Sequence, residues 1–205
     1  MLNRKWARFG KNRDRGTLIV ISGPSGVGKS SICGRILKRD RRTRYSVSAT
    51  TRAPRPGEKN RRHYIFLKPR EFRRWIRQGK FIEHARVHEN LYGTPRRYLE
   101  TQLKKGYDVI LDIDVQGGRN LMREFPDEVF IFVAAPSMDE LSRRLRMRGA
   151  DSSTIIKKRL VVARKEMKQA KHYNYLVGNQ DLARTVDMVR TIIKVERYKR
   201  RLVWR

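Results

Sequence analysis

One stretch constrains the fold of this chain more than any other: residues 23–31, which read GPSGVGKSS. The pattern G-x-x-x-x-G-K-S is typical of a phosphate-binding loop, in which backbone N–H groups surround the phosphates and glycines allow a tight backbone path. In such a loop Lys29 reaches the β- and γ-phosphate oxygens, and the Ser30 hydroxyl is a ligand of Mg²⁺. The motif predicts binding of a nucleotide phosphate and leaves the reaction open.

The residues on either side of the loop argue against coincidence. Residues 17–22, TLIVIS, are typical of a buried parallel strand, and residues 31–38 are typical of a helix. A helix that begins at the loop directs the positive end of its dipole at the anion. Strand, glycine loop and helix therefore follow one another in the order that a phosphate site needs.

Length and composition limit the class of protein. At 205 residues the chain suits one domain of ordinary size with a small insertion. No apolar run approaches the roughly 18 residues that cross a bilayer, and residues 1–10 lack the apolar core of a secretory signal. The single Cys33 cannot form an internal disulfide and is expected to pack beneath the loop helix. We expect a soluble, cytoplasmic protein without membrane contact, in preference to one with a basic organellar presequence.

The charge of the chain is unusual. It holds 50 Lys and Arg against 20 Asp and Glu, a net charge of +30, and the basic residues crowd both ends. Such a balance predicts attraction to polyanions through phosphate neutralisation, here a weak, sequence-independent association of the basic tails with RNA or DNA. A solvated basic surface with no dedicated partner is the alternative, because charge runs alone are weak indicators.

Strand-like and helical runs alternate along most of the chain, which predicts a doubly wound α/β fold with a parallel sheet and helices on both faces. Residues 45–94 interrupt this alternation and predict a small antiparallel unit, inserted between the loop helix and the next parallel strand. The insert is expected to hold strands at 45–51, 63–67 and 81–87, a helix at 71–78 and an irregular proline-rich loop at 52–58. The expected core strands are 107–114, 128–134 and 175–177, and the expected helices are 95–105, 116–124, 137–146, 152–170 and 181–196.

Several further segments follow the loop in a fixed order, and together with it they resemble the guanylate kinases over residues 17–197. The segments are SVSATTRAPRPGE (46–58), FIEHARVHENLYGT (81–94), VILDIDVQGG (109–118), RRLRMRG (143–149), KKRL (157–160) and a late Asn179. The resemblance implies transfer of the terminal phosphoryl group of ATP, the co-substrate, to GMP with Mg²⁺, and a lid that closes over both nucleotides. It divides the chain into a basic tail (1–16), core with P-loop (17–44), GMP-binding subdomain (45–94), core (95–136), lid region (137–170), core (171–197) and basic tail (198–205).

The resemblance places the acceptor phosphate on Arg52 and Arg55, with the hydroxyls of Tyr64 and Tyr92 completing its shell. The planar guanidinium fork donates two parallel hydrogen bonds to phosphate oxygens. A solvated loop is the competing interpretation of the two arginines, but the adjacent prolines favour a fixed presentation. The acceptor phosphate is itself largely ionised near neutrality, so no general base is needed.

Base selection is implied for Glu83, with Ser48 and Thr94. Guanine presents N1–H and its exocyclic amine as adjacent donors, which one carboxylate accepts together, whereas adenine presents a bare N1 that the carboxylate repels. A site built on such hydrogen bonds rejects an unsuitable analogue by about 10⁴–10⁵ in favourable cases.

Asp112 and Asp114 end a buried strand, where ligands of open α/β sheets gather. The resemblance assigns Asp112 to Mg²⁺ together with Ser30, and Asp114 to guanosine, although these two roles could be reversed. Arg144 and Arg148, four residues apart on one helical face, are implied to meet the triphosphate, as is Arg159. The implied ATP site comprises Gly23, Pro24, Ser25, Gly26, Val27, Gly28, Lys29, Ser30, Ser31 and Asn179, the last against adenine.

The sequence departs from the family pattern at one point and leaves alternatives open. Where the family usually reads V-x-N-D, this chain has VGNQD (177–181), which puts the adenine contacts in doubt. Two other functions compete: an inactive relative that binds protein partners, although such relatives lose the phosphate loop, and a kinase for another phosphorylated acceptor, against which Glu83 and Ser48 argue. Monomer and homodimer both remain open.

Overall fold

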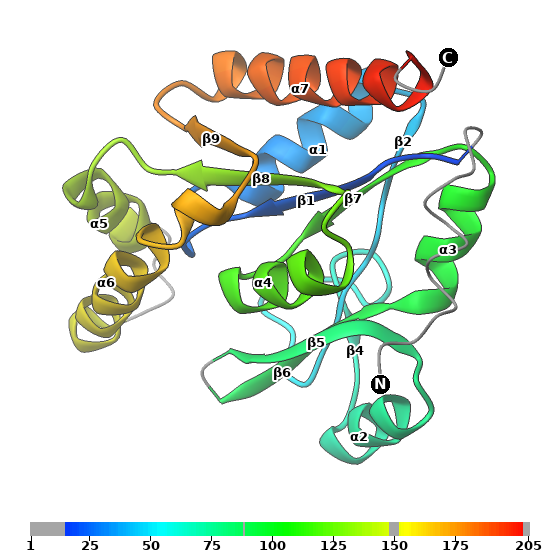
Figure 1. The fold of residues 1–205 in the computed structure, drawn as a ribbon. Coiled ribbons are helices and arrows are strands. Elements are labelled where there is room, and N and C mark those ends of the chain that lie inside the picture. Colours follow the sequence, from blue (N-terminus) through cyan, green and yellow to red (C-terminus); the bar gives the residue numbers. More distant parts are fainter. Residues whose placement is uncertain (1–14, 88, 148–151, 203–205) are drawn as a thin grey trace.

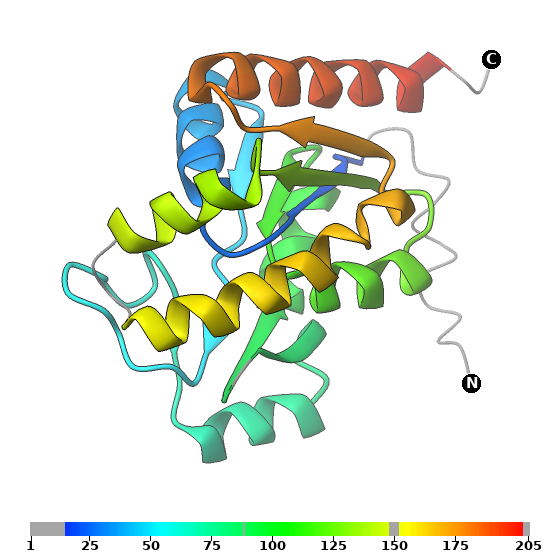
Figure 2. The same cartoon turned by 90° about the vertical axis from the view of Figure 1, so that its left-hand side faces the viewer.

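The structure, a computed structural model, describes residues 15–87, 89–147 and 152–202 (Figures 1 and 2). Within these residues, five parallel strands form the main sheet in the order β2-β7-β1-β8-β9. Every residue of β1 and β8 is buried, as expected for strands covered on both faces. The strands span Leu18–Ser22 (β1), Thr43–Tyr45 (β2), Asp108–Asp112 (β7), Val129–Ala134 (β8) and Tyr175–Gly178 (β9).

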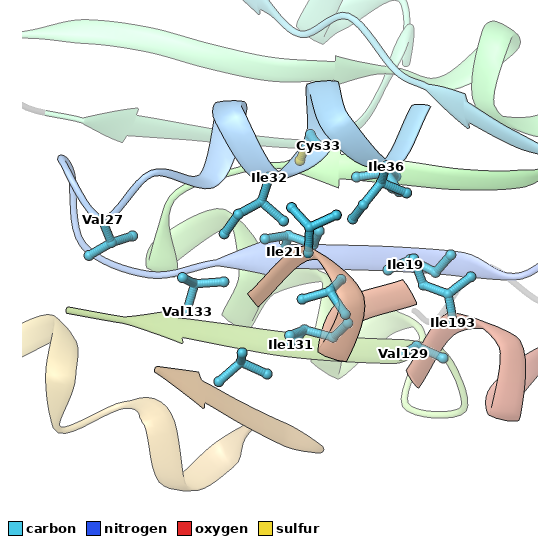
Figure 3. Packing of buried hydrophobic residues seen from close by; sticks show 14 of the residues in the cluster. Ile19, Ile21, Val27, Ile32, Cys33, Ile36, Val129, Ile131, Val133 and Ile193 are labelled. Carbon is cyan, nitrogen blue, oxygen red and sulfur yellow. The ribbon is translucent and has the colours of Figure 1, made fainter. Parts of the chain in front are cut away.

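Helices cover both faces of the main sheet, because successive side chains of a strand point to opposite faces (Figure 1). Ile19 of β1 joins the cluster that contains the buried residues of α1 and α7, part of which Figure 3 shows, and Cys33 lies in it as expected. Val20 joins a second cluster with α3 and α4. The predicted doubly wound α/β core is therefore confirmed. The helices span Lys29–Arg39 (α1), Arg96–Lys104 (α3), Val115–Glu124 (α4) and Leu182–Leu202 (α7).

The inserted unit is a four-stranded sheet in the order β4-β3-β6-β5, with α2 packed against it. The prediction of a wholly antiparallel unit is wrong for one pair, since β3 and β4 run parallel. Residues 51–64 connect them and are long enough for the crossover that parallel strands need. The elements span Ala49–Thr50 (β3), Ile65–Phe66 (β4), Pro69–Arg77 (α2), Phe81–Val87 (β5) and Asn90–Pro95 (β6).

The sequence prediction is wrong about one strand in this part of the chain and lacks another. The run 45–51 is not one strand, because Tyr45 ends β2 in the main sheet while Ala49 begins β3 in the small one. Ser46 donates its N–H to the carbonyl of Ile110, which holds the chain at the main sheet before it turns away. The strand β6 is absent from the sequence prediction, because polar and apolar residues do not alternate along its sequence, NLYGTP.

Two helices follow β8, α5 (Met138–Met147) and α6 (Ser153–Met167), with a short 3-10 turn at Ala170–His172. Both begin at serine caps: the Ser137 hydroxyl accepts from the N–H of Glu140, and that of Ser152 accepts from the N–H of Ile155. Predicted bounds of both helices agree with the structure to within a few residues. Over the part of the chain that is described, no helix is both long and apolar enough to cross a membrane.

The closing helix α7 is tied to the amino-terminal edge of the main sheet by ion pairs. Arg197 lies 2.7 Å from a carboxylate oxygen of Asp40 and 2.6 Å from one of Asp108. Glu128 accepts hydrogen bonds from Arg15 and, at 2.9 Å, from Arg200. These groups are largely buried, so the pairs join the last helix of the chain to strands near its beginning and middle.

Candidate active site

A cavity of about 1140 Å³ opens at the carboxyl ends of the parallel strands, where ligands of α/β sheets gather. The phosphate loop and Asp112 contribute one side, the inserted unit contributes Glu83 of β5 and Arg52 of the loop after β3, and α5 and α6 contribute Arg144 and Arg159. Three parts of the sequence that are far apart thus meet around one space.

The phosphate loop has a path that only glycine permits at its critical positions. Gly23 has φ 140°, and a Cβ there would lie 2.1 Å from the carbonyl oxygen of Val133 on the neighbouring strand. Gly28 has φ 95°, and a Cβ there would lie 2.6 Å from Nδ2 of Asn179. The glycines therefore let the loop lie directly against β8 and Asn179.

Lys29 and Ser30 stand at the start of α1, where the helix dipole favours an anion. The Lys29 ammonium donates to the carbonyl oxygens of Gly23 at 2.6 Å and Pro24 at 3.2 Å. The Ser30 hydroxyl donates to Oδ2 of Asp112 at 2.7 Å. A hydroxyl and a carboxylate oxygen are donors that Mg²⁺ accepts, so this pair fits the predicted metal site.

In the proline-rich loop, the Glu58 carboxylate contacts both Arg52 and Arg55. Both Glu58 carboxylate oxygens accept from Nη2 of Arg52 at 2.9 Å, and Oε2 also accepts from the N–H of Arg55 at 2.7 Å. These contacts with Arg52 and Arg55 hold the pKa of the Glu58 carboxyl below its ordinary value, against its partial burial. The Arg52 guanidinium also lies 5.4 Å from the ring centre of Tyr64. Glu58 therefore fixes the loop that the sequence predicted to hold a phosphate.

Glu83 is the most buried carboxylate that lines the cavity, with 8% of its surface exposed. Burial raises the pKa of its carboxyl to about 7; the hydrogen bond from Thr94, 2.7 Å to Oε1, lowers it, and the charge of Asp114 raises it. A Cβ at Gly117 would lie 2.8 Å from Oε2, so the start of α4 packs closely against the carboxylate. Asp114 itself caps α4 by accepting from the N–H groups of Gln116 and Gly117.

Arg144 lines the cavity, and its guanidinium also contacts Asn179, a residue that lies against the phosphate loop. Its guanidinium donates to Oε1 of Glu140 at 2.7 Å and to the carbonyl oxygen of Asn179 at 2.9 Å. The Asn179 side chain in turn donates to the carbonyl oxygen of Val27 at 2.7 Å and is 4% exposed. Asn179 thus braces the phosphate loop, and its contact with adenine stays a prediction.

Most of the residues predicted for the site line the cavity together. Four do not: Pro24, Val27 and Asn179 lie behind the loop surface, and Thr94 is fully buried and reaches the site through Glu83. Arg148 lies outside the described residues. The predicted residues that line the cavity are Gly23, Ser25, Gly26, Gly28, Lys29, Ser30, Ser31, Ser48, Arg52, Arg55, Tyr64, Glu83, Tyr92, Asp112, Asp114, Arg144 and Arg159.

The sequence prediction missed several residues in the cavity wall or in contact with it. Glu58, which contacts Arg52 and Arg55 but does not itself line the cavity, stood in the sequence only as one acid in a basic loop, and its role depends on the folded path of that loop. Arg119 and Arg123 stand four residues apart on α4, a spacing that could have indicated a shared face. Glu166 of α6 also lines the cavity, and burial raises the pKa of its carboxyl to about 7.

A phosphate loop at the carboxyl edge of a parallel sheet, which shares its cavity with a second cationic site, defines a P-loop kinase. The family model described as guanylate kinase matches residues 15–196. The guanylate kinase of Rubrobacter xylanophilus is 47% identical over 183 residues, covering 87% of this chain and 96% of that protein. That of Caldanaerobacter subterraneus subsp. tengcongensis is 43% identical over 185 residues, covering 90% of each.

The crystal structure of guanylate kinase from Anaplasma phagocytophilum agrees with these sequences. It has a TM-score of 0.76 and 36% identity, and the match covers 90% of this chain and 87% of that one. The chain belongs to the guanylate kinase family, the ATP:GMP phosphotransferases. The family predicted from the sequence motifs is therefore confirmed.

Proposed function

We propose that this protein transfers the γ-phosphoryl group of ATP to GMP, using Mg²⁺, with the residue roles given below. One observation carries the proposal: a single cavity joins Lys29 and Ser30 of the phosphate loop to Arg52, Arg55 and Glu83 of the insert. Donor and acceptor phosphates bound at these two places would share one cavity. Phosphoryl transfer depends mainly on such positioning and on charge neutralisation.

The acceptor phosphate binds Arg52 and Arg55, and the hydroxyls of Tyr64 and Tyr92 complete its shell. Glu58 orients Arg52 before the nucleotide arrives, which reduces the entropy lost on binding. An ionised phosphate oxygen of GMP attacks the γ-phosphorus in line, and the ADP oxygen leaves. No residue has to remove a proton, because the second pKa of a phosphate monoester is about 6.

Guanine binds Glu83, Ser48 and Thr94, with Asp114 on the guanosine side. The Ser48 hydroxyl lines the cavity, is buried, and has no hydrogen-bond partner among the described residues. An unpaired buried hydroxyl is costly, and a polar edge of the base would satisfy it. Glu83 accepts from N1–H and the exocyclic amine only when it is ionised.

The donor triphosphate lies in the phosphate loop, with Lys29 on its β- and γ-oxygens. Arg144, Arg148 and Arg159 stabilise the negative charge that spreads over the transferring group. Ser30 and Asp112 hold Mg²⁺, which when bound neutralises charge on the β- and γ-phosphates. A site with few protein ligands suits Mg²⁺, which takes most of its ligands from phosphate and water oxygens.

The remaining proposals concern the chain as a whole. The insert 45–94 and the lid 137–170 close over a core formed by 17–44, 95–136 and 171–197. The protein acts in the cytoplasm, as a monomer or homodimer. Its basic tails, 1–16 and 198–205, add a weak association with nucleic acid that falls steeply with salt. A variant without residues 1–14 would bind RNA as well as the whole protein if the amino-terminal tail has no part in this.

A coupled assay of ADP formation with GMP, dGMP, AMP and UMP tests the proposed reaction. We expect turnover of GMP that requires Mg²⁺, and turnover of AMP and UMP lower by at least about 10³-fold, near the range expected for hydrogen-bond selection. Absence of ADP formation from ATP, Mg²⁺ and GMP would refute the proposal. Comparable rates with AMP would refute the role of Glu83.

A further inference from the structure

A stripe of arginines runs along the solvent side of α2 in the inserted unit. Positions 70, 73, 74 and 77 repeat at the spacing i, i+3, i+4 and i+7, which places them on one face of a helix. All are exposed, and an exposed lysine stands beyond each end of the helix. The arginine face, as we call it, consists of Arg70, Arg73, Arg74 and Arg77.

The opposite side of α2 is anchored in the small sheet. Phe72 is fully buried and its ring lies 4.5 Å from that of Phe81, while Trp75 and Ile76 pack on the same cluster. The helix is therefore fixed in rotation about its axis. The arginines of α2 are exposed to solvent, and α2 lies at the end of the molecule opposite α7 in both views (Figures 1 and 2).

Acidic residues do not neutralise this face. Residues 68–80 contain six basic side chains and one acid, Glu71, which lies 3.6 Å from Arg74. Both partners are more than one-third exposed, so the pair stabilises little. The six basic side chains also take no part in the nucleotide cavity, since none of them lines it. The charge of the arginine face therefore lies outside the site proposed for phosphoryl transfer.

We propose that the arginine face binds the phosphate backbone of nucleic acid without sequence preference. From Arg70 to Arg77 the helix rises about 10 Å, at about 1.5 Å per residue. That length spans about three phosphates of one strand at about 3.4 Å each. Arginine suits this contact, because its fork donates in pairs to phosphate oxygens. The proposal moves the main site of the nucleic-acid association suggested above from the tails to α2, and it does not depend on the catalytic roles.

A membrane surface fits α2 less well than nucleic acid. An interfacial helix inserts an apolar face among the lipid headgroups. In α2 that face is Phe72, Trp75 and Ile76, which already pack against the small sheet. None of the exposed large apolar side chains lies on α2. Only phosphate contacts remain available to it, and these are what a polynucleotide backbone offers.

The test compares two fourfold variants of the whole protein that lower the net charge equally. One replaces the arginines of α2 (R70Q, R73Q, R74Q and R77Q). The other replaces four exposed arginines of the core that form no ion pair among the described residues (R35Q, R41Q, R42Q and R184Q). Fluorescence anisotropy with a labelled single-stranded RNA of about 20 nucleotides, longer than a typical single-strand site, measures binding across a salt series.

We expect the α2 variant to bind RNA at least about tenfold more weakly at low salt, and the magnitude of its salt slope to fall by about 2, at about 0.7 for each of the roughly three phosphates that the protein no longer neutralises. The core variant should stay close to wild type. Equal weakening of both variants would overturn the proposal in favour of net charge, and unchanged binding of the α2 variant would overturn it in favour of the tails. Binding to phosphatidylserine vesicles that is lost in the α2 variant, while RNA binding is kept, would also overturn it. GMP-dependent ADP formation by both variants should equal wild type and serves as the check of folding.

Discussion

Replacing Glu83 by glutamine separates the structural cost of this carboxylate from its proposed role in binding guanine. Burial raises the pKa of the Glu83 carboxyl from 4.5 to about 7, and this difference corresponds to about 3 kcal/mol. Because the folded-state pKa is the higher one, the protonated form is favoured in the folded protein. The contribution of Glu83 to stability is therefore present below about pH 4.5 and is lost as the pH rises through about 7.

The first measurement is the free energy of unfolding, from denaturant titrations at about pH 5 and about pH 8. Wild-type protein should lose up to about 3 kcal/mol over this interval through Glu83. The Glu83→Gln variant cannot ionise there and should lose correspondingly less. The difference between the two proteins isolates the buried carboxyl from all other titrating groups.

The second measurement is the pH dependence of kcat/KM for GMP. With a pKa of about 7, about one-tenth of Glu83 is ionised at about pH 6, so kcat/KM should rise about tenfold between about pH 6 and about pH 8. The GMP phosphate, with a second pKa of about 6, titrates in the same range. The pH profile of Glu83→Gln should therefore report the titration of the GMP phosphate alone. Its kcat/KM for GMP should be about 10- to 100-fold below wild type at about pH 8, because the variant loses a hydrogen bond to a charged group. Identical pH profiles for the two proteins would refute the reasoning.

Three further predictions concern the loop, the acceptor site and the closing helix. Lys29→Met should lower kcat at least about 10²-fold, as expected for a lost charge at the transferring group, with an unchanged melting temperature; activity near wild type would contradict the role of Lys29. Glu58→Gln should raise KM for GMP by about tenfold with little change in kcat, because Arg52 then loses the partner that orients it, and steady-state kinetics at varied GMP measures this. Arg197→Met should lower the free energy of unfolding by about 3 kcal/mol in denaturant titrations, because it leaves the two largely buried carboxylates of Asp40 and Asp108 without this ion pair. A loss below about 0.5 kcal/mol would show that water replaces the guanidinium.

The core of this fold could be predicted because its strands and helices follow from local patterns of apolar and polar residues. The strand of residues 18–22 is apolar except for its last residue, and it leads into a loop whose glycines match the phosphate-binding motif. The strand, loop and helix could therefore be placed from the sequence. Phe81–Val87 was also placed correctly. The split between β2 and β3 was not predictable, because the run from Tyr45 to Thr50 keeps one alternation while it passes from one sheet to another.

Residues of the candidate site could be proposed from the sequence where they stand in a segment that resembles the guanylate kinases, and not where contacts in the folded chain decide their role. Glu83 and Ser48 could be proposed because their segments carry this resemblance, and the chemistry of guanine is consistent with it. Glu58 and Asn179 could not be understood in that way, because one acts on Arg52 across a loop and the other on Val27 across the sheet. Contacts between residues that are distant in the chain follow from the packing of strands, which a linear pattern does not record.

The ion pairs of α7 have a consequence for how the chain folds as it is synthesised. Asp108 occupies the edge of the sheet long before Arg197, which pairs with it, has been made, whereas Glu128 already has Arg15 as a partner. At about 5–20 residues per second, several seconds separate the two events. During that interval the carboxylate of Asp108 lacks its ion-pair partner, and burying it unpaired would be costly. Completion of the last helix is then the step that supplies this partner, and a ribosome stalled before it would hold an unfinished, protease-sensitive chain.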